Sequence, residues 1–438
     1  MDRLLLSELI RWKESPGRKP LILRGARQTG KTWLMKAFGS ESFNETAYIN
    51  FEQNKNLAGL FIETIKVETI IQALQVQTGK QINPETTLII FDEIQEAPEA
   101  ITALKYFYEN APGYCIVAAG SLLGVALHRS VSFPVGKVDF MDVYPMNFHE
   151  FLKALGEEKI SELIKNRQWE LLKVFKQKLT ERLRQYYIVG GMPEAVAQFS
   201  RNGDVQKVRQ IQKNILEAYE LDFSKHAPQK DVPRIRMVWN SIPGQLAREK
   251  RKFVYSHIKE GARAKDFEIA LAWLKDCGQV LRIHRVSKPG LPLKAYEDVT
   301  AFKLFLIDIG LLGAMSGLSP KIILKGNAVF TEFKGALTEQ YVCQELKSRG
   351  GLPMFYWSAD RGTSEIDFII QVEDKVIPIE VKAEENLKSK SLKVYQDKFS
   401  PALAVRTSLS DFRDDANMHN IPLWGFAGWL DGLAESGF

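Results

Sequence analysis

The stretch Leu21–Thr32, LILRGARQTGKT, decides how the first part of the chain folds. Its apolar start indicates a short strand, the pattern G-x-x-x-x-G-K-T follows, and Trp33–Phe38 continues as a helix. This is the phosphate-binding P-loop pattern in the strand–loop–helix context that it requires. Gly25 and Gly30 allow the backbone to curl closely around a phosphate, and the N-terminus of the helix attracts the anion. The stretch therefore predicts a triphosphate site.

The P-loop pattern also assigns individual roles. Lys31 is expected to reach the β- and γ-phosphates of ATP, and the Thr32 hydroxyl is expected to hold Mg²⁺. The alternative is a glycine-containing turn, which a match at every fixed position of the pattern disfavours. The predicted ATP-binding residues are Gly25, Ala26, Arg27, Gln28, Thr29, Gly30, Lys31, Thr32 and Trp33.

A second acidic motif follows at Thr87–Ile94, TLIIFDEI. An apolar run that ends in two carboxylates is the Walker B arrangement, in which a buried parallel strand carries acids to the ligand-binding edge of the sheet. Asp92 is expected to hold the Mg²⁺ shell, and Glu93 to act as the general base for the attacking water. Such a run alone is weak evidence, but it follows an intact P-loop.

A third apolar strand, Tyr114–Ala119, leads to Ser121. In ATPases of this architecture the polar residue at this position contacts the γ-phosphate or the water, so Ser121 is a candidate catalytic residue. The alternative is a serine that caps the next helix. Arg129 and Lys137 lie where a neighbouring subunit could supply a cation, although both also suit an ordinary surface.

The composition is that of a mildly basic globular protein, with a formal net charge of +6 and a pI near 8.9. This balance permits contact with DNA but does not require it. The three cysteines are far apart, which argues against a disulfide framework and favours the cytoplasm. No apolar run has the length of a membrane span, so no membrane partner is expected.

The N-terminal half resembles a known family. The phrases GARQTGKT, IIFDEIQ, AAGSLLG, VYPMNFHEF and YYIVGGMPEAV are similar to those of a large set of prokaryotic AAA-type P-loop ATPases whose C-terminal domain is PD-(D/E)xK nuclease-like. The resemblance implies a P-loop ATPase core over residues 1–145 and a helical lid over 146–224. It also suggests a homo-oligomer that uses ATP and Mg²⁺.

The middle of the chain, residues 225–317, predicts a winged-helix-like domain. Helical segments up to 265–276 precede two strands, Val280–Val286 and Phe302–Ile307, and the family resemblance points the same way. Such a domain can place a helix in the major groove of DNA. Winged helices also serve as spacers and protein contacts, so clustered cations here indicate DNA without establishing it.

Residues 328–438 carry a second set of carboxylates. The pattern predicts a helix, three strands, a helix and a strand, with Glu339 on the first helix and Asp367, Glu380 and Lys382 on strands. This αβββαβ order with D-x12-E-x-K resembles the PD-(D/E)xK, or restriction-endonuclease-like, superfamily. The expected fold class is thus α/β: an AAA-type core with a helical lid, then a winged-helix domain, then this nuclease-like domain.

The four C-terminal residues form a candidate metal-dependent nuclease site. Asp367 and Glu380 on adjacent strands could hold a second divalent metal, Mg²⁺ or Mn²⁺, and alternation places Lys382 on the same face as Glu380. Glu339 would ligate another metal or support the first ligands. A strand with E-x-K is more often a salt bridge, and the fold does not establish activity.

Two functions follow from these patterns. The first is an Mg²⁺-dependent ATPase that acts on DNA, with a candidate nuclease site near its C-terminus. The alternative is a nucleotide-dependent switch or scaffold that controls a protein partner or oligomerisation. In this alternative the nuclease-like domain binds without cleaving.

Overall fold

The computed structural model describes residues 2–64, 66–120, 134–248, 251–325, 331–360, 363–385, 389–415 and 417–435. Contacts divide the chain into two compact units. The N-terminal unit comprises Asp2–Tyr144 and Asp276–Gln279, and the C-terminal unit comprises Pro145–Lys275 and Val280–Phe438. The domain boundary expected after residue 145 lies next to this division. The other expected domains fall in the C-terminal unit, apart from Asp276–Gln279.

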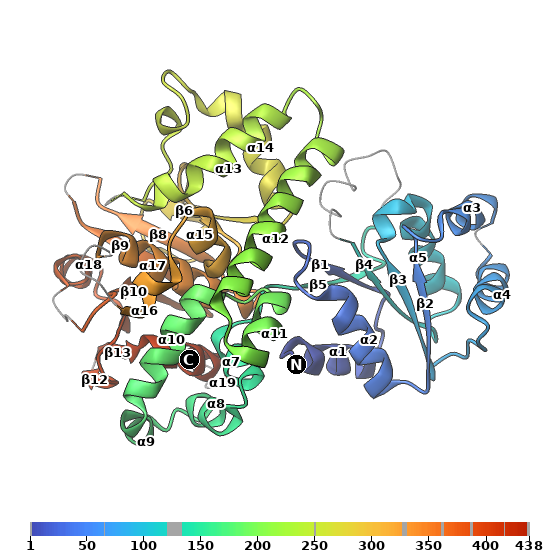
Figure 1. Cartoon of the computed structure of the whole chain (residues 1–438), viewed down its shortest axis with the longest axis horizontal. Helices are drawn as coiled ribbons and strands as arrows, with labels where there is room; N and C mark the ends of the chain where they lie inside the picture. The colour runs from blue at the N-terminus through green and yellow to red at the C-terminus, as the bar shows by residue number, and fades with distance from the viewer. Residues whose placement is uncertain are drawn as a thin grey trace. The chain divides into compact units, whose positions relative to one another are not determined.

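The N-terminal unit is built on a parallel five-stranded sheet, drawn in blue and cyan in Figure 1, with the order β2-β3-β4-β1-β5. Its strands are β1 (Leu21–Arg24), β2 (Glu45–Asn50), β3 (Thr87–Asp92), β4 (Cys115–Ala119) and β5 (Asp139–Asp142). Its helices are α1 (Leu5–Glu14), α2 (Lys31–Ser42), α3 (Lys55–Glu63), α4 (Val67–Thr78) and α5 (Pro98–Asn110), with the short η1 (Ile94–Glu96).

Both faces of this sheet are covered, which explains why its inner strands β1, β3 and β4 are almost continuously apolar. Alternate residues of β3 enter different cores: Ile89 and Phe91 pack with α3, α4 and α5, whereas Leu88 and Ile90 pack with α1 and α2. The P-loop leaves the carboxyl end of β1, and Asp92 ends β3, with β4 between the two strands. Ligands of open parallel sheets bind at this edge.

The C-terminal unit begins with helices. Asn147 caps the first of them in a reciprocal capping box with Glu150, as the sequence N-F-H-E favours. The helices up to residue 276 are α7 (Phe148–Ala154), α8 (Glu158–Lys165), α9 (Trp169–Val174), α10 (Lys176–Val189), α11 (Pro193–Asn202), α12 (Val205–His226), α13 (Val232–Leu246), η2 (Tyr255–His257) and α14 (Ala264–Asp276).

The remainder contributes an eight-stranded mixed sheet with the order β12-β13-β11-β10-β9-β8-β6-β7. Its strands are β6 (Val280–Val286), β7 (Glu297–Leu306), β8 (Met354–Ser358), β9 (Glu365–Val372), β10 (Lys375–Val381), β11 (Ala404–Ser408), β12 (Arg413–Asp415) and β13 (Met418–Pro422). The other elements are η3 (Leu293–Tyr296), α15 (Ile309–Met315), α16 (Pro320–Lys325), α17 (Thr331–Ser348), α18 (Lys390–Phe399), η5 (Leu423–Gly425) and α19 (Phe426–Glu435).

The expected succession of helix, three strands, helix and strand is present as α17, β8, β9, β10, α18 and β11. The hairpin β6–β7, expected as a separate wing, instead extends this sheet, because β6 pairs in parallel with β8. Figure 1 shows β6 and β8 next to each other behind α15 and α17. The sheet therefore joins residues that the sequence assigned to two domains.

The helices expected as a lid pack on α17 within the same unit. Glu345 accepts a hydrogen bond from the backbone N–H of Phe148 at 2.7 Å, and the Gln344 side-chain amide donates one to the Tyr186 hydroxyl at 2.9 Å. The rings of Phe148, Tyr186 and Tyr341 also contact one another. Within the described ranges, no helix is both long and apolar enough to span a membrane.

Candidate functional site

The P-loop between β1 and α2 depends on backbone conformations that its glycines allow. Gly30 immediately precedes α2 with φ 91°, and Gly25 has φ 146°. A Cβ atom at Gly25 would collide with the backbone carbonyl of Val143, which follows β5. These positions require glycine because a side chain would be strained at one and would have no room at the other.

Lys31 is the central cation of this loop. Its ammonium group donates to the carbonyl oxygens of Gly25 and Ala26, at 2.9 and 2.7 Å. Burial lowers the pKa of Lys31 to about 8, although the negative charges of Glu93 and Asp92 oppose this shift. The ammonium group therefore lies inside the loop, where it donates to neutral carbonyl oxygens.

Asp92 meets the P-loop from β3. Its Oδ2 atom accepts hydrogen bonds from the hydroxyls of Thr32 and Tyr48, both at 2.8 Å. The backbone N–H of Glu93 donates to Oδ1 at 3.1 Å. Thr32 and Asp92, predicted as Mg²⁺ ligands from positions far apart in the sequence, therefore lie in contact. Oxygen donors of this kind suit Mg²⁺, so the residues fit the ion.

Glu93 has a left-handed backbone with φ 51°, which is uncommon for a residue other than glycine and is often found at functional sites. Its Oε2 atom accepts a hydrogen bond of 2.6 Å from the side-chain amide of Gln95. This turn breaks the strand at Asp92, so the two successive acids do not continue the strand alternation.

Two residues that the sequence reasoning missed support this site. Tyr48 lies on β2, which pairs with β3, and an aromatic residue in the strand beside an acidic motif was the available signal. Arg3 donates to the carbonyls of Thr29 at 2.9 Å and Tyr144 at 2.7 Å, linking the P-loop to the end of this unit. No local sequence motif predicts that Arg3 belongs to this site.

The other predicted residues are placed as follows. Ala26 and Thr29 are buried, and the Thr29 hydroxyl donates to the Ala26 carbonyl at 3.0 Å. Gln28 has φ 64°, and Trp33 is 45% exposed on α2 beside the loop. Arg27 precedes Gln28 in the loop. Ser121 and Arg129 lie outside the described residues. Lys137 forms an ion pair with Glu109 at 3.0 Å.

Family comparison gives three matches along the chain. Residues 17–152 match the AAA domain family. Together with the P-loop geometry, this match supports an AAA-type P-loop fold for residues 17–152. Residues 180–322 and 334–426 match two families described as domains of unknown function. The first of these ranges crosses the expected boundary between lid and winged helix.

Solved structures give weaker likenesses. A Walker-type ATPase of Pyrococcus abyssi is 17% identical, with 72% of this chain and 95% of that chain covered and a TM-score of 0.45. AMPPCP-bound DnaA of Aquifex aeolicus is 14% identical, with coverage of 62% and 86% and a TM-score of 0.27. Orc1 of Aeropyrum pernix, in complex with DNA, is 15% identical, with coverage of 72% and 93% and a TM-score of 0.25. No curated protein matches the chain. These TM-scores are too low to carry a functional inference.

A second site lies in the C-terminal unit, in a cleft of about 560 Å³ that we call the carboxylate cleft. It gathers all four residues predicted from the nuclease-like pattern and adds two arginines from the segment that follows α13. Its lining is Ala247, Arg248, Arg251, Gly335, Glu339, Asp367, Glu380, Val381, Lys382 and Ala383.

The acids of this cleft already have cationic partners. Arg251 pairs with Glu339, and Lys382 pairs with Glu380 at 2.7 Å. A buried lysine of β7, Lys303, lies 3.5 Å from Glu339 and 3.7 Å from Asp367. Sequence reasoning counted Arg251 only among the clustered cations of the middle region, and it missed Lys303. A single lysine inside the apolar run of β7 was the available signal for the latter.

Burial and mutual repulsion set the protonation of the acids. The pKa of Asp367 is raised well above its ordinary range by burial and by the negative charges of Glu339 and Glu380. Burial also raises the pKa of Glu380, against the influence of Lys382. For Glu339 burial acts in the same direction, but Arg251 and Lys303 outweigh it and lower the pKa.

This arrangement does not fit the expected second metal well. Across the described residues, no three His, Cys, Asp or Glu side chains form a group able to hold a metal ion. The Glu380 Oε2 atom is buried without a hydrogen-bond partner, which is the one feature that favours an added cation. The second metal at Asp367 and Glu380 therefore stays a prediction.

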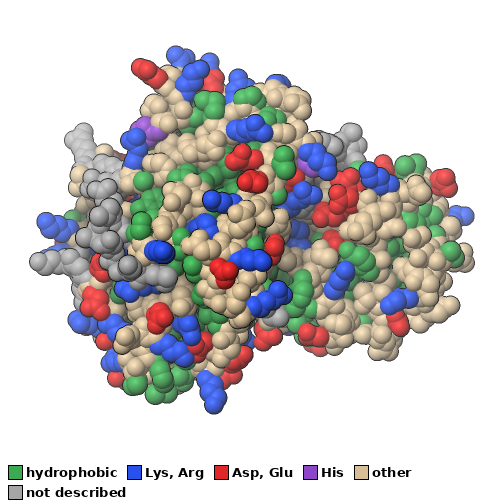
Figure 2. Space-filling view, viewed as in Figure 1, with side chains coloured by type: hydrophobic (Ala, Val, Ile, Leu, Met, Phe, Trp, Pro, Cys, Tyr) green, Lys and Arg blue, Asp and Glu red, His purple; other side chains and the backbone are tan. Residues whose placement is uncertain are grey.

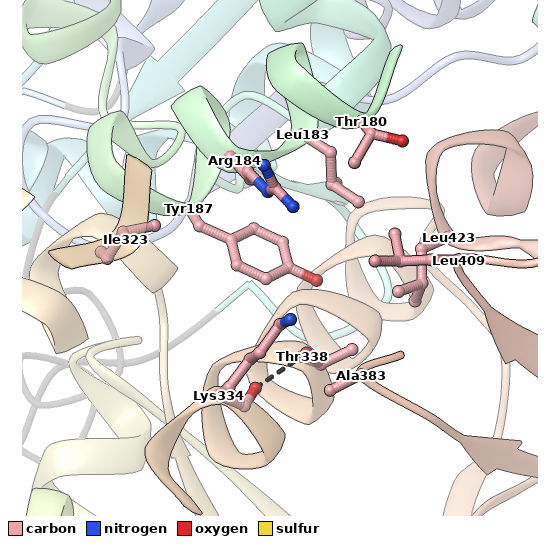
Figure 3. Close-up of a pocket in the computed structure, with 10 residues that line it drawn as sticks. All are labelled: Thr180, Leu183, Arg184, Tyr187, Ile323, Lys334, Thr338, Ala383, Leu409 and Leu423. Atoms are coloured by element: carbon pink, nitrogen blue, oxygen red, sulfur yellow. Dashed lines mark hydrogen bonds between the residues drawn. The ribbon is translucent and has the colours of Figure 1, made fainter. Parts of the chain in front are cut away.

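A smaller cavity lies behind the carboxylate cleft, and Ala383 lines both. Figure 3 shows the Tyr187 hydroxyl directed between Thr338 and Leu423, with Arg184 and Lys334 on opposite sides of the ring. This cavity has a volume of about 30 Å³, which leaves room for little more than one water molecule.

Proposed function

We propose that the N-terminal unit binds ATP with Mg²⁺ and hydrolyses it. The observation that carries this proposal is the contact of Thr32 with Asp92 at 2.8 Å, one residue from Lys31. The site thus joins a phosphate-facing ammonium group, two oxygen donors for Mg²⁺ and the adjacent carboxylate of Glu93. These are the parts that phosphoryl transfer to water requires.

In this proposal each residue has one task. Lys31 leaves the loop carbonyls and pairs with the β- and γ-phosphates, while Thr32 and Asp92 hold Mg²⁺ directly or through water. When bound, Mg²⁺ supplies charge neutralisation between the phosphates. Glu93 accepts the proton of the attacking water, and Ser121 senses the γ-phosphate.

The test compares wild type with Glu93→Gln in two measurements. Calorimetry with ATP and Mg²⁺ is expected to give similar affinities, because glutamine keeps the size of the side chain. Phosphate release is expected to fall at least about 100-fold, the lower end of the range for a lost general base. Equal turnover would remove Glu93 from this role, and absent ATP binding in wild type would contradict the proposal itself.

We further propose that the protein acts on DNA and that the carboxylate cleft contacts the phosphodiester backbone. Arg248, Arg251 and Lys382 line this cleft, and cations of this kind supply most of the affinity for nucleic acid. We propose that the segment α13–β7, expected to be winged-helix-like, also contacts the DNA beside this cleft. Figure 2 shows Lys and Arg interspersed with Asp and Glu on the visible face, so a local cleft is a more specific candidate than overall charge.

ATP turnover measured with and without DNA tests this second proposal. Stimulation by DNA supports it, and the switch or scaffold alternative predicts ATP-dependent homo-oligomerisation that needs no DNA. Metal-dependent cleavage is a competing function, favoured by the unpartnered Glu380 oxygen. Cleavage of plasmid and single-stranded DNA with Mg²⁺ or Mn²⁺ that disappears in Glu380→Ala would establish it.

A further inference from the structure

Lys303 is the least expected charge in the C-terminal unit. It lies between Phe302 and Leu304 on β7, and its side chain has no exposed surface. A buried ammonium group is strongly unfavourable unless it is surrounded by compensating charge. The chain therefore holds this cation only because its surroundings supply that charge.

Those surroundings are three carboxylates from two different elements. The Lys303 ammonium lies 2.6 Å from Glu365 and 3.7 Å from Asp367, both on β9. It lies 3.5 Å from Glu339, on α17. Three acidic side chains converging on one point are the usual environment of a divalent metal. Here an ammonium group of the same chain occupies the centre.

Arg251 adds a second positive charge to the same acids. Its guanidinium pairs with Glu339, and it passes over α17 at Gly335, where a Cβ atom would lie only 2.8 Å from its Nη2. Burial by itself lowers the pKa of Lys303, but Glu339, Glu365 and Asp367 more than reverse this and raise it. The lysine thus keeps its charge throughout the physiological range.

We propose that Lys303 replaces a divalent metal in the carboxylate cleft, so that the cleft binds a phosphodiester without metal and does not cleave it. A metal beside Asp367 would be repelled by the ammonium group at 3.7 Å and would have to compete with Arg251 for Glu339. The choice of ligand rests on the proposed DNA contact. The replacement itself rests only on Lys303 and its carboxylates.

Thermal unfolding of the full chain with Mn²⁺ and without nucleotide tests the replacement. Mn²⁺ is expected to change the unfolding temperature of wild type and of Asp367→Asn by the same amount. Lys303→Met is expected to unfold at a lower temperature and to recover by several degrees with Mn²⁺, because the ion fills the vacated centre. The double variant Lys303→Met/Asp367→Asn should not recover. A surface variant, Lys173→Met, serves as the control.

One result overturns the replacement: a Mn²⁺-dependent rise in wild type that Asp367→Asn abolishes, because metal and lysine would then coexist. If Lys303→Met does not fold even with Mn²⁺, calorimetric titration of Mn²⁺ into wild type and Asp367→Asn decides alone. Weak heats that are equal in wild type and Asp367→Asn support the replacement. A saturable Mn²⁺ site that is present only in wild type contradicts it.

Binding of a fluorescent single-stranded or duplex oligonucleotide in EDTA tests the ligand. Affinity in EDTA is expected to match that in Mg²⁺ at equal ionic strength, and Lys382→Met should weaken it several-fold relative to Lys173→Met. A requirement for Mg²⁺ would contradict metal-free binding. No binding under either condition would contradict the DNA proposal, while the Mn²⁺ experiment would still judge the role of Lys303.

Discussion

The P-loop site and the carboxylate cleft use the same kinds of side chain in opposite ways. At the P-loop, the hydrogen bonds to Asp92 come from two hydroxyls and an amide, and those of Lys31 go to backbone carbonyls. The three groups that donate to Asp92 are all neutral. In the cleft, Glu339 and Glu380 are paired with cations of the chain itself. Whether a group of acids can bind a metal therefore depends on the side chains that already pair with them.

The largest expected effect is on stability, and it concerns Lys303 rather than Lys31. Lys303→Met should lower the free energy of unfolding of the C-terminal unit by about 3–5 kcal/mol, the usual cost of leaving buried charges unpaired. Denaturant unfolding measures it, with the exposed Lys173→Met as the control. A loss below about 1 kcal/mol would mean that the three carboxylates do not depend on Lys303, and the comparison would fail.

The second effect concerns Lys31 of the P-loop, which should contribute to ATP affinity rather than to the stability of the fold. Lys31→Ala should weaken ATP binding at least about 100-fold, or about 2.7 kcal/mol, because the triphosphate loses its main point charge. Calorimetry with Mg²⁺ measures it. Lys55→Ala, at the exposed start of α3, should bind normally, and unchanged binding by Lys31→Ala would remove the assigned role.

The third prediction tests whether the backbone of the P-loop is as constrained as its sequence implies. Gly25→Ala should lower the free energy of unfolding of the N-terminal unit by about 1–3 kcal/mol, since its Cβ would meet the Val143 carbonyl. Gly59→Ala, with open space around it on α3, should be neutral or slightly stabilising in the same assay. Equal behaviour of the two variants would contradict this account.

The fourth prediction follows from the lowered pKa of Lys31, about 8. Below pH 8 the ammonium group is already charged, so its titration should not make ATP affinity change with pH. Above pH 8 ATP must bind together with a proton, and affinity should fall by up to about tenfold per pH unit. Calorimetry in two buffers of different ionisation enthalpy would detect proton uptake near pH 8; its absence would contradict the prediction.

The smallest effect concerns Tyr48, the hydroxyl donor to Asp92. Tyr48→Phe should lower kcat/KM for ATP by a few-fold, corresponding to about 0.5–1.5 kcal/mol for one hydrogen bond. Tyr106→Phe on α5 provides a matched control. If the two variants are indistinguishable, Asp92 needs only Thr32 to hold its position.

The sequence by itself determined the P-loop site, because its parts are local. Residues 25–33 are consecutive, and Asp92 follows an apolar run that is typical of a buried strand. It also placed Glu339, Asp367, Glu380 and Lys382 on the right succession of elements, which periodicity and spacing encode.

Only the tertiary structure decided what these C-terminal acids contact. Lys303 and Arg251 reach them because β6 pairs with β8 and carries β7 into the same sheet, a long-range pairing that no local pattern specifies. The order of the strands in a sheet is decided by packing between distant segments, so the charge balance of the cleft could not be read from the motif. The P-loop is less affected by this limit, because residues 25–33 are consecutive and Asp92 carries a recognisable motif of its own.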